Sequence, residues 1–362
     1  MDHEEQSTQP GELGRPQPTP PIEGAVQRVR PRRGSHRAQR VTLGVGLLAL
    51  VVTAGLTVSR GRTEPAPTAT PVPSAPASKS GPPPAASSPT VTRPPGTLFG
   101  VSLPRGQAAS QALALDRLRQ QFGRLPVARV FAPGLPSATW ADDPVLAALG
   151  SGSAVVYSFR GDPTAAAAGQ YDDRVTALLA SRPPGVTVWM AFYHEPEDQV
   201  ASGTFTAEQF RAATAHLAPV IRGGGGISTT ILQEYTLQTA SGRDWHEFYS
   251  PAIDVLGWDA YNIEAKHGTP TYKTAQEFVG PVLVVAKETG KPFAWAEFGS
   301  PCIRTDPDCS QRAEWVRNVG QAFRDSGARF ATYWNRETMD GQIDYTLRDA
   351  PSIAAYRRLV SG

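Results

Sequence analysis

Two glutamates are placed by their flanking residues where chemistry is possible. Residues 188–193 read VWMAFY, and His194, Glu195 and Pro196 follow directly. Residues 293–298 read FAWAEF and contain Glu297. Both runs predict buried strands, because a strand covered on both faces is continuously apolar. We expect Pro196 to end the first strand and to keep Glu195 in an extended conformation.

Carboxyl groups at two strand ends have a specific chemical use. In a barrel of parallel strands, the active site lies at the C-terminal ends of the strands. The two runs are the fourth and seventh predicted strands, so Glu195 and Glu297 would face each other across the barrel mouth. Carboxyl groups about 5–5.5 Å apart can flank a glycosidic bond, one as the nucleophile and one as the acid and then the base. We predict that Glu195 and Glu297 are such a pair.

The elements that would position this pair lie between residues 97 and 362. Helical stretches at 107–121, 206–217 and 310–324 alternate with strands, and Thr206 and Gln209 form a capping-box pattern. This alternation, repeated eight times over about 265 residues, predicts a closed (β/α)8 TIM barrel of the α/β class. No nucleotide-binding glycine motif follows a predicted strand. The predicted strands are 98–102, 127–131, 154–159, 186–193, 229–235, 255–261, 293–298 and 329–334.

Four segments of the predicted barrel resemble clan A glycoside hydrolases, and family 26 most closely, whose commonest members are β-mannanases. They are His194-Glu195, GWDAYN at 257–262, WAEFG at 295–299 and ATYWN at 331–335. The resemblance covers residues 97–358 and implies a retaining glycosidase with a TIM-barrel fold. It implies that Glu195 is the acid/base and that Glu297 is the nucleophile.

The same resemblance implies roles for further residues. His194, which precedes the acid/base, would contact the substrate or a carboxyl group. Tyr261 would hydrogen-bond the nucleophile, and Trp334 would form a platform for a sugar ring. Apart from the resemblance, we expect Asp259 to orient Tyr261 or to line the cleft, and Glu234, near another strand end, to lie at the surface or at the cleft rim.

The substrate stays open at this point. β-Mannanases usually have an aromatic-rich segment after the acid/base, but Phe205 is the only aromatic residue within 196–206. Xylan, β-1,3 or mixed-linkage glucan, or a bacterial envelope polysaccharide are alternatives to mannan. A catalytically silent carbohydrate-binding barrel is a further hypothesis. A metal-dependent hydrolase would need two or three histidines at strand ends, and His194 is the only one there, so we expect no metal and no cofactor.

The N-terminal 96 residues have a different composition. Residues 1–40 are polar, with six arginines between 28 and 40, and predict a disordered cytoplasmic leader. Residues 41–58 carry no charge and come near the length of about 20 that a transmembrane helix needs. The arginines place the later residues outside the cell. We favour an uncleaved signal anchor over a cleaved signal peptide. Residues 59–96, with eleven prolines, predict an extended linker.

Two cysteines and the overall charge complete these expectations. Cys302 and Cys309 lie seven residues apart among turn-forming residues, which predicts a local disulfide in an exported protein. The net charge of +2 does not indicate nucleic-acid binding. We expect a monomer whose domain at 97–362 is held outside the cell membrane, or secreted if the leader is cleaved, and whose partner is a polysaccharide.

Overall fold

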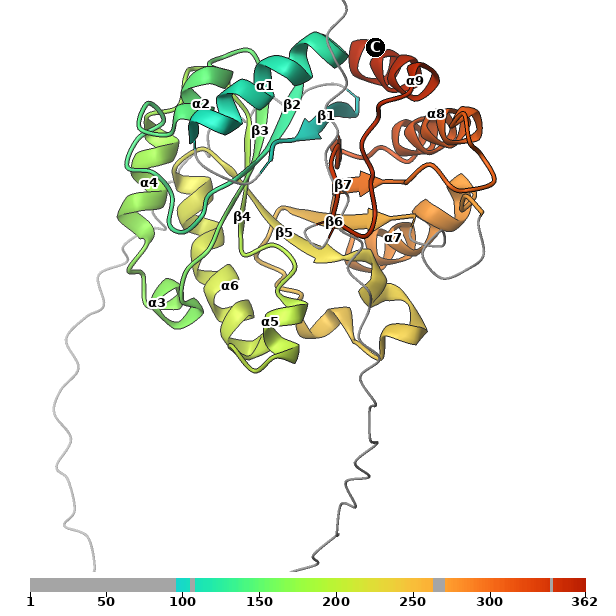
Figure 1. Cartoon of the computed structure of the whole chain (residues 1–362). Coiled ribbons are helices and arrows are strands. Elements are labelled where there is room, and N and C mark those ends of the chain that lie inside the picture. Colours follow the sequence, from blue (N-terminus) through green and yellow to red (C-terminus); the bar gives the residue numbers. More distant parts are fainter. Residues whose placement is uncertain (1–95, 105–107, 263–270, 339–340) are drawn as a thin grey trace, which may run out of the picture. The chain divides into compact units, whose positions relative to one another are not determined.

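Eight parallel strands close into a barrel in which each strand pairs with its neighbours in chain order (Figure 1). The computed structural model describes residues 96–104, 108–262, 271–338 and 341–362. The predicted TIM barrel is confirmed, and each strand end lies within two residues of its predicted position. The strands are β1 (Leu98–Ser102), β2 (Val127–Phe131), β3 (Ala154–Phe159), β4 (Val188–Phe192), β5 (Ile227–Gln233), β6 (Val255–Tyr261), β7 (Phe293–Gly299) and β8 (Phe330–Tyr333).

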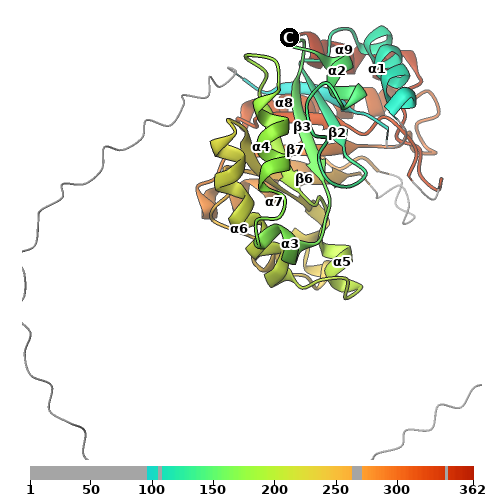
Figure 2. The same ribbon diagram turned by 90° about the vertical axis from the view of Figure 1, so that its left-hand side faces the viewer.

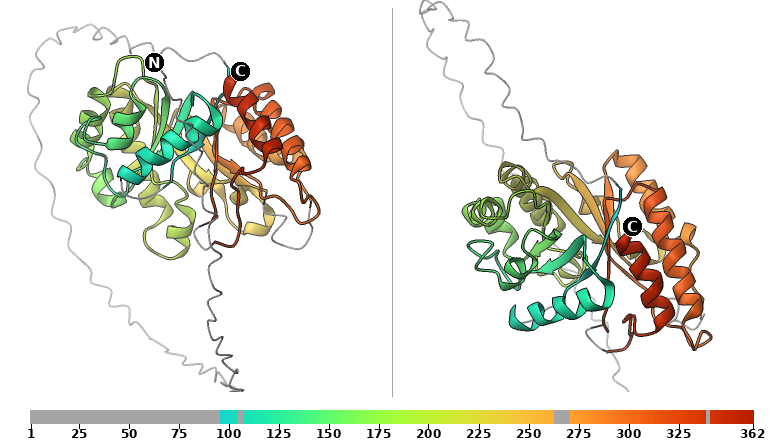
Figure 3. Two further views of the ribbon diagram at one scale, coloured as in Figure 1. Left: turned by 45° about the horizontal axis from the view of Figure 1, so that its top comes forward. Right: turned by 90° about the horizontal axis from the view of Figure 1, so that it is seen from above.

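Helices surround the strands, as the view from above in Figure 3 shows. The longest are α1 (Ala108–Phe122), α6 (Ala207–Gly223), α7 (Ala275–Thr289), α8 (Ser310–Asp325) and α9 (Ala350–Ser361). Shorter ones are α2 (Pro144–Leu149), α3 (Pro163–Ala167), α4 (Asp172–Ala180) and α5 (Glu197–Ala201). Three short 3-10 helices follow β5, namely η1 (Glu234–Leu237), η2 (Thr239–Ser241) and η3 (Trp245–Glu247).

Local signals explain where individual helices begin. The predicted capping box at α6 is present: the backbone N–H of Gln209 donates to Thr206 Oγ1 at 3.1 Å, and the backbone N–H of Thr206 donates to Gln209 Oε1 at 2.8 Å. Thr274 and Glu277 form the same motif at α7. Each box satisfies backbone donors that the first helical turn leaves free. Helix α6 lies beside α4 on the outside of the barrel (Figure 2).

Alternation along the strands divides the core in two. One set of side chains fills the barrel interior, and the other packs between the strands and the helices. Trp295 belongs to the outer set, where its ring stacks on Phe323 of α8 at a centroid distance of 4.0 Å. The interior set contains Val127, Val156, Trp189, Ala191, Ile231, Val255, Ala294, Ala296 and Phe330.

The N-terminal predictions fall outside the described residues. The leader at 1–40, the anchor at 41–58 and the linker up to residue 95 all belong to this part of the chain. From residue 96 onward, no described helix has both the length and the apolar character that crossing a bilayer requires.

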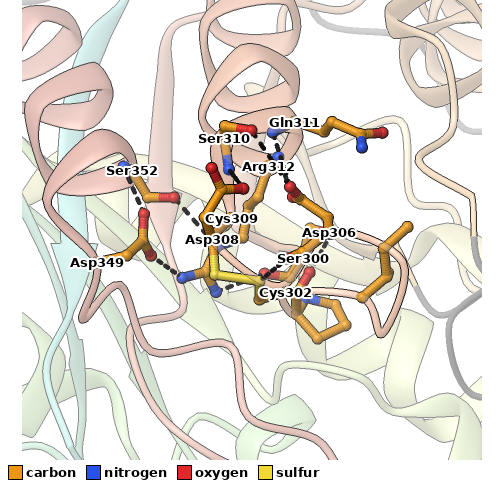
Figure 4. The surroundings of a disulfide bond; sticks show 12 residues. Ser300, Cys302, Asp306, Asp308, Cys309, Ser310, Gln311, Arg312, Asp349 and Ser352 are labelled. Atoms are coloured by element: carbon orange, nitrogen blue, oxygen red, sulfur yellow. Dashed lines mark hydrogen bonds and ion pairs between the residues drawn. A yellow bond between two sulfur atoms is a disulfide. The ribbon is translucent and has the colours of Figure 1, made fainter.

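The predicted disulfide joins Cys302 to Cys309 in the connection between β7 and α8, with the Cα atoms 5.3 Å apart (Figure 4). Within this loop, the Asp306 carboxylate accepts the backbone N–H of Arg312 at 2.8 Å. The Arg312 guanidinium pairs with Asp349, the N-cap residue of α9. The disulfide loop therefore fixes the first turn of α8 and, through Arg312, the start of α9, which packs beside α8.

Replacing both cysteines by serine (Cys302→Ser with Cys309→Ser) should destabilise the folded domain by about 2.5 kcal/mol, the chain-entropy value for closing a loop of about eight residues. Urea unfolding of the variant and of the wild type would measure this difference. A reductant should lower the stability of the wild type alone. Equal free energies of unfolding for the two proteins would contradict a stabilising role.

Candidate active site

Glu195 lies just beyond β4, in a turn of unusual backbone geometry. Tyr193 and Glu195 have φ angles of 53° and 50°. The backbone N–H of Tyr193 donates to Phe159 O of β3 at 2.8 Å, and that of Glu195 donates to Ile231 O of β5 at 3.0 Å. The expected extended conformation of Glu195 is therefore wrong. The chain has to bond both neighbouring strands while it turns into α5, and positive φ angles achieve this.

Glu297 faces the barrel interior because β7 contains one extra residue. Trp258 of β6 pairs with Trp295, but the next residue, Asp259, pairs with Glu297. Trp295 points toward the helices and Ala296 points inward. Strict alternation would send Glu297 outward, but the bulge lets Ala296 and Glu297 share the interior side. This reorientation places the carboxyl group in the mouth of the barrel.

Three carboxyl groups meet at this point. One oxygen each of Glu195, Asp259 and Glu297 lies within 4.8 Å of the others. Glu195 is half-buried, whereas Asp259 and Glu297 are only 3% and 2% exposed. The structure thus brings together the predicted pair of glutamates and the predicted Asp259. The separation is close to the roughly 5–5.5 Å that double-displacement chemistry at a sugar requires.

Two polar side chains hold Glu297. The Tyr261 hydroxyl donates to Glu297 Oε2, which is the contact expected of Tyr261. Arg129 Nε of β2 lies 3.8 Å from Glu297 Oε1, and Arg129 Nη1 donates to Ser158 Oγ of β3 at 2.6 Å. Our sequence analysis missed Arg129. Its signal was a charged residue at the inward-facing position of an otherwise apolar strand, VARVF.

Asp259 is the most strongly perturbed acid of the site. Neither of its carboxyl oxygens has a hydrogen-bond partner within the described part of the chain. Burial, followed by the charges of Glu297 and Glu195, raises the pKa of Asp259 well above its usual range, and Arg129 opposes this only in part. This shift favours the protonated form of Asp259, which can donate a hydrogen bond.

His194 and Trp334 line the aromatic side of the mouth. His194 is buried, with Nε2 3.3 Å from Arg160 Nη2 and its ring edge-on to Phe131 at 5.1 Å. Trp334 is 7% exposed and lies edge-on to Tyr261 at 6.3 Å. The Arg336 guanidinium sits 3.5 Å from the centre of the Trp334 ring system and covers one of its faces. Only the uncovered part of Trp334 can meet a sugar.

A fourth acid, Glu197, supports the turn that carries Glu195. It is 1% exposed, and its Oε1 accepts the backbone N–H of Gln233 at 2.8 Å and the Thr236 hydroxyl at 3.0 Å. These bonds tie the start of α5 to the end of β5 and to η1. Burial raises the pKa of Glu197 to about 7, although its hydrogen bonds and Arg243 act in the opposite direction. Our sequence analysis did not single out Glu197.

The pKa of Glu197 has a consequence for stability. Between an unfolded value of 4.5 and a folded value of about 7, the folded state holds the proton that the unfolded chain releases. Stability from this group is therefore complete below about pH 4.5, falls as the pH rises to about 7 and changes little beyond. Glu197→Gln keeps an acceptor oxygen but cannot ionise. From pH 5 to pH 8 the variant should lose about 2–3 kcal/mol less stability than the wild type.

Thermal or urea unfolding at both pH values would measure this difference. Glu208→Gln, at an exposed position in the first turn of α6, is the matched control and should follow the wild type. Parallel pH dependence in Glu197→Gln and in the wild type would mean that Glu197 titrates normally.

The carboxyl oxygens at the barrel mouth determine which metal ions could bind there. The three carboxyl oxygens are close enough to share a divalent cation, and oxygen donors of this kind suit magnesium or calcium rather than zinc. Among the described residues, no histidine or cysteine joins this group. A histidine-based catalytic zinc site, which the metal hypothesis required, is thus not built from the described side chains.

Comparisons with known proteins identify the fold. No model of a protein family matches the sequence, and no curated protein matches it significantly. A glucosidase from Croceicoccus marinus has a TM-score of 0.51 and 12% identity, over 75% of this chain and 69% of that one. A β-1,3-glucanase of Cryptomeria japonica pollen has a TM-score of 0.50 and 14% identity, over 70% and 96% of the two chains.

A further similar structure is a family 26 endo-β-1,4-mannanase from Cellulomonas fimi, with a TM-score of 0.48 and 16% identity over 74% of this chain and 71% of that one. At 12% and 14% identity, the two structures with TM-scores of 0.51 and 0.50 show the architecture and not the substrate. By its architecture, the chain is a (β/α)8 barrel of the kind seen in the glucosidase and the β-1,3-glucanase.

Proposed function

We propose that the barrel is a retaining glycoside hydrolase of clan A, similar to family 26, that cleaves β-linked polysaccharide. The observation that carries this proposal is the approach of Glu195 and Glu297 to within 4.8 Å at the C-terminal mouth of the barrel. Inverting enzymes need about 6.5–9.5 Å between their carboxyl groups to admit a water molecule, so the short separation favours retention.

The surroundings of the two glutamates support different roles. Glu297 is buried, fixed by the Tyr261 hydroxyl and close to the Arg129 guanidinium, as suits a nucleophile that attacks the anomeric carbon from a fixed position. Glu195 is more exposed and lies beside a cavity, as suits an acid that protonates the departing oxygen and then takes a proton from water. Asp259, in its protonated form, would donate a hydrogen bond to the sugar between them.

The nature of the polysaccharide is part of the same proposal. The family resemblance favours β-mannan, while xylan and β-glucans are the alternatives of the same clan. A catalytically silent carbohydrate-binding barrel is the alternative from another class. It would bind one of these polymers without releasing reducing ends, and a polysaccharide panel with product analysis separates the two.

Glu297→Gln should lower the rate of hydrolysis by about three orders of magnitude or more, because the amide cannot attack the anomeric carbon. Reducing-end release from the best polysaccharide of the panel is the measurement. Glutamine keeps an acceptor for Tyr261, so the variant should remain folded, as circular dichroism would show. Glu314→Gln, on the exposed side of α8, is the matched control.

Full activity of Glu297→Gln would remove Glu297 from the mechanism. The same assay with EDTA addresses the metal alternative. The proposed mechanism needs no cation, and activity that is lost with EDTA and restored by magnesium or calcium would contradict it.

We further propose that this domain is held at the outer face of a membrane by residues 41–58. The support is the uncharged stretch, the arginines before it, and a disulfide that suits an oxidising compartment. In cells that express the full chain, the protein should sediment with membranes and should resist extraction by high salt. External protease should release the barrel domain. A protein that stays soluble and protected from protease would overturn this localisation.

A further inference from the structure

A cavity of about 220 Å³ adjoins the acid/base and not the nucleophile. Glu195, Asp259 and Tyr261 form one side, and η1 with the end of β5 forms the other. A second cavity of about 430 Å³ shares Glu234 and Gln238 with the first, so the two adjoin and continue outward along α7. Sites for small molecules occupy roughly 300–1,000 Å³. The two spaces together thus form a path of suitable size.

The side on which this path lies identifies its occupant. In the proposed mechanism, the acid protonates the oxygen of the leaving group, so the leaving sugar lies against Glu195. The other half of the substrate becomes bonded to Glu297, which does not line either cavity. The inner cavity is therefore placed to hold the sugar that departs first.

The walls of the inner cavity offer both hydrogen bonds and an aromatic face. Glu234 is 5% exposed, and Gln238 Nε2 donates to its Oε2 at 3.0 Å. Within the described part of the chain, this is the only hydrogen bond of the Glu234 carboxyl group. We had expected Glu234 at the surface or rim, and it is instead a buried lining residue. Tyr235 is 40% exposed, which is unusual for an aromatic ring beside a buried polar group.

The charges around the inner cavity restrict the ligand. Its described lining includes three acids, Glu195, Glu234 and Asp259, and no basic residue. A sugar that carries a carboxylate would be repelled. Burial raises the pKa of Glu234, with Lys273 of the outer cavity and the Gln238 hydrogen bond acting against it. Carboxyl groups that retain protons suit hydroxyl partners, to which they can both donate and accept.

We propose that the inner cavity is the leaving-group subsite, that Glu234 and Gln238 hydrogen-bond the hydroxyls of an uncharged sugar there, and that Tyr235 packs against its ring. This inference rests on the proposed hydrolase function. The outer cavity continues the path, so the leaving group can extend beyond one sugar.

Transfer to an added acceptor tests the subsite. With an aryl β-glycoside of the sugar identified by the polysaccharide panel, Glu297 bonds to the anomeric carbon, the bond to the aryl oxygen breaks, and the phenol departs with a proton from Glu195. An acceptor in the inner cavity then competes with water. Its hydroxyl oxygen bonds to the anomeric carbon, the ester bond to Glu297 breaks, and the hydroxyl proton passes to Glu195. The ratio of transfer product to free sugar, measured by mass spectrometry, reports on acceptor binding alone because both products share one intermediate.

With methyl β-glucoside as the acceptor, Glu234→Leu should lower this ratio by about tenfold, as expected for the loss of one hydrogen bond to a carboxyl group. Tyr235→Ala should also lower it, and this exposed position should tolerate the change without loss of folding. In the wild type, methyl β-glucuronide should be a poorer acceptor than the neutral glucoside, because the acids of the lining repel its carboxylate. The controls Glu314→Leu and Val284→Ala lie on exposed helix surfaces and should leave the ratio unchanged.

The outcomes of this experiment distinguish the subsite inference from the proposed hydrolase function on which it rests. In one outcome, the wild type turns over the donor while Glu234→Leu and Tyr235→Ala both keep the wild-type ratio of transfer product to free sugar. That result would overturn the subsite and leave the hydrolase function in place. Methyl β-glucuronide accepted as well as the neutral glucoside would overturn the exclusion of acidic sugars. No turnover of any aryl glycoside or polysaccharide by the wild type would overturn the hydrolase function and the subsite together.

Discussion

Electrostatic repulsion among three carboxyl groups governs the mouth of the barrel. At 4.8 Å, two full negative charges repel each other by about 3.5 kcal/mol if the effective dielectric constant is about 20. One buried guanidinium, Arg129, offsets part of this repulsion. This repulsion disfavours three full charges and favours protonation of Asp259, whose pKa is raised well above its usual range and whose carboxyl oxygens have no hydrogen-bond partner among the described residues. The different roles proposed for the acids follow from this division of charge.

The backbone produces this crowding, and the barrel stabilises it. Positive φ angles at Tyr193 and Glu195 each cost on the order of 1–2 kcal/mol, and the bulge in β7 interrupts regular pairing. Strand hydrogen bonds on both sides of β4, the Glu197 contacts and the packed interior hold these conformations in place. Such local strain is typical of functional sites, where the surrounding fold determines the geometry.

The sequence was sufficient for the fold because its signal is repeated. Eight apolar runs between helical stretches specify the strand order, and their ends locate Glu195 and Glu297 at the same mouth. Local pattern was also enough for the Thr206 capping box and for the pairing of Cys302 with Cys309. It failed where tertiary contacts decide the conformation, as at Glu195, whose φ angle is set by bonds to β3 and β5.

The sequence also did not reveal which polar side chains would be buried. Arg129, Glu197 and Glu234 acquire their importance from neighbours 28 or more residues away or from a cavity that several elements enclose. No single segment carries that information. Of the three, Arg129 was the easiest to infer from the sequence, because a charged residue among inward-facing apolar residues breaks the pattern of β2.

The extra residue in β7 also limits how this barrel can diverge. With Ala296 lost, Trp295 and Glu297 would stay opposite Trp258 and Asp259, so β7 could pair regularly with the Glu297 side chain still pointing inward. If the bulge closed without that loss, Ala296 would stand opposite Asp259 and Glu297 would point outward, although every functional side chain remained encoded. The direction of the Glu297 side chain thus depends on the number of residues in β7 as well as on their identity.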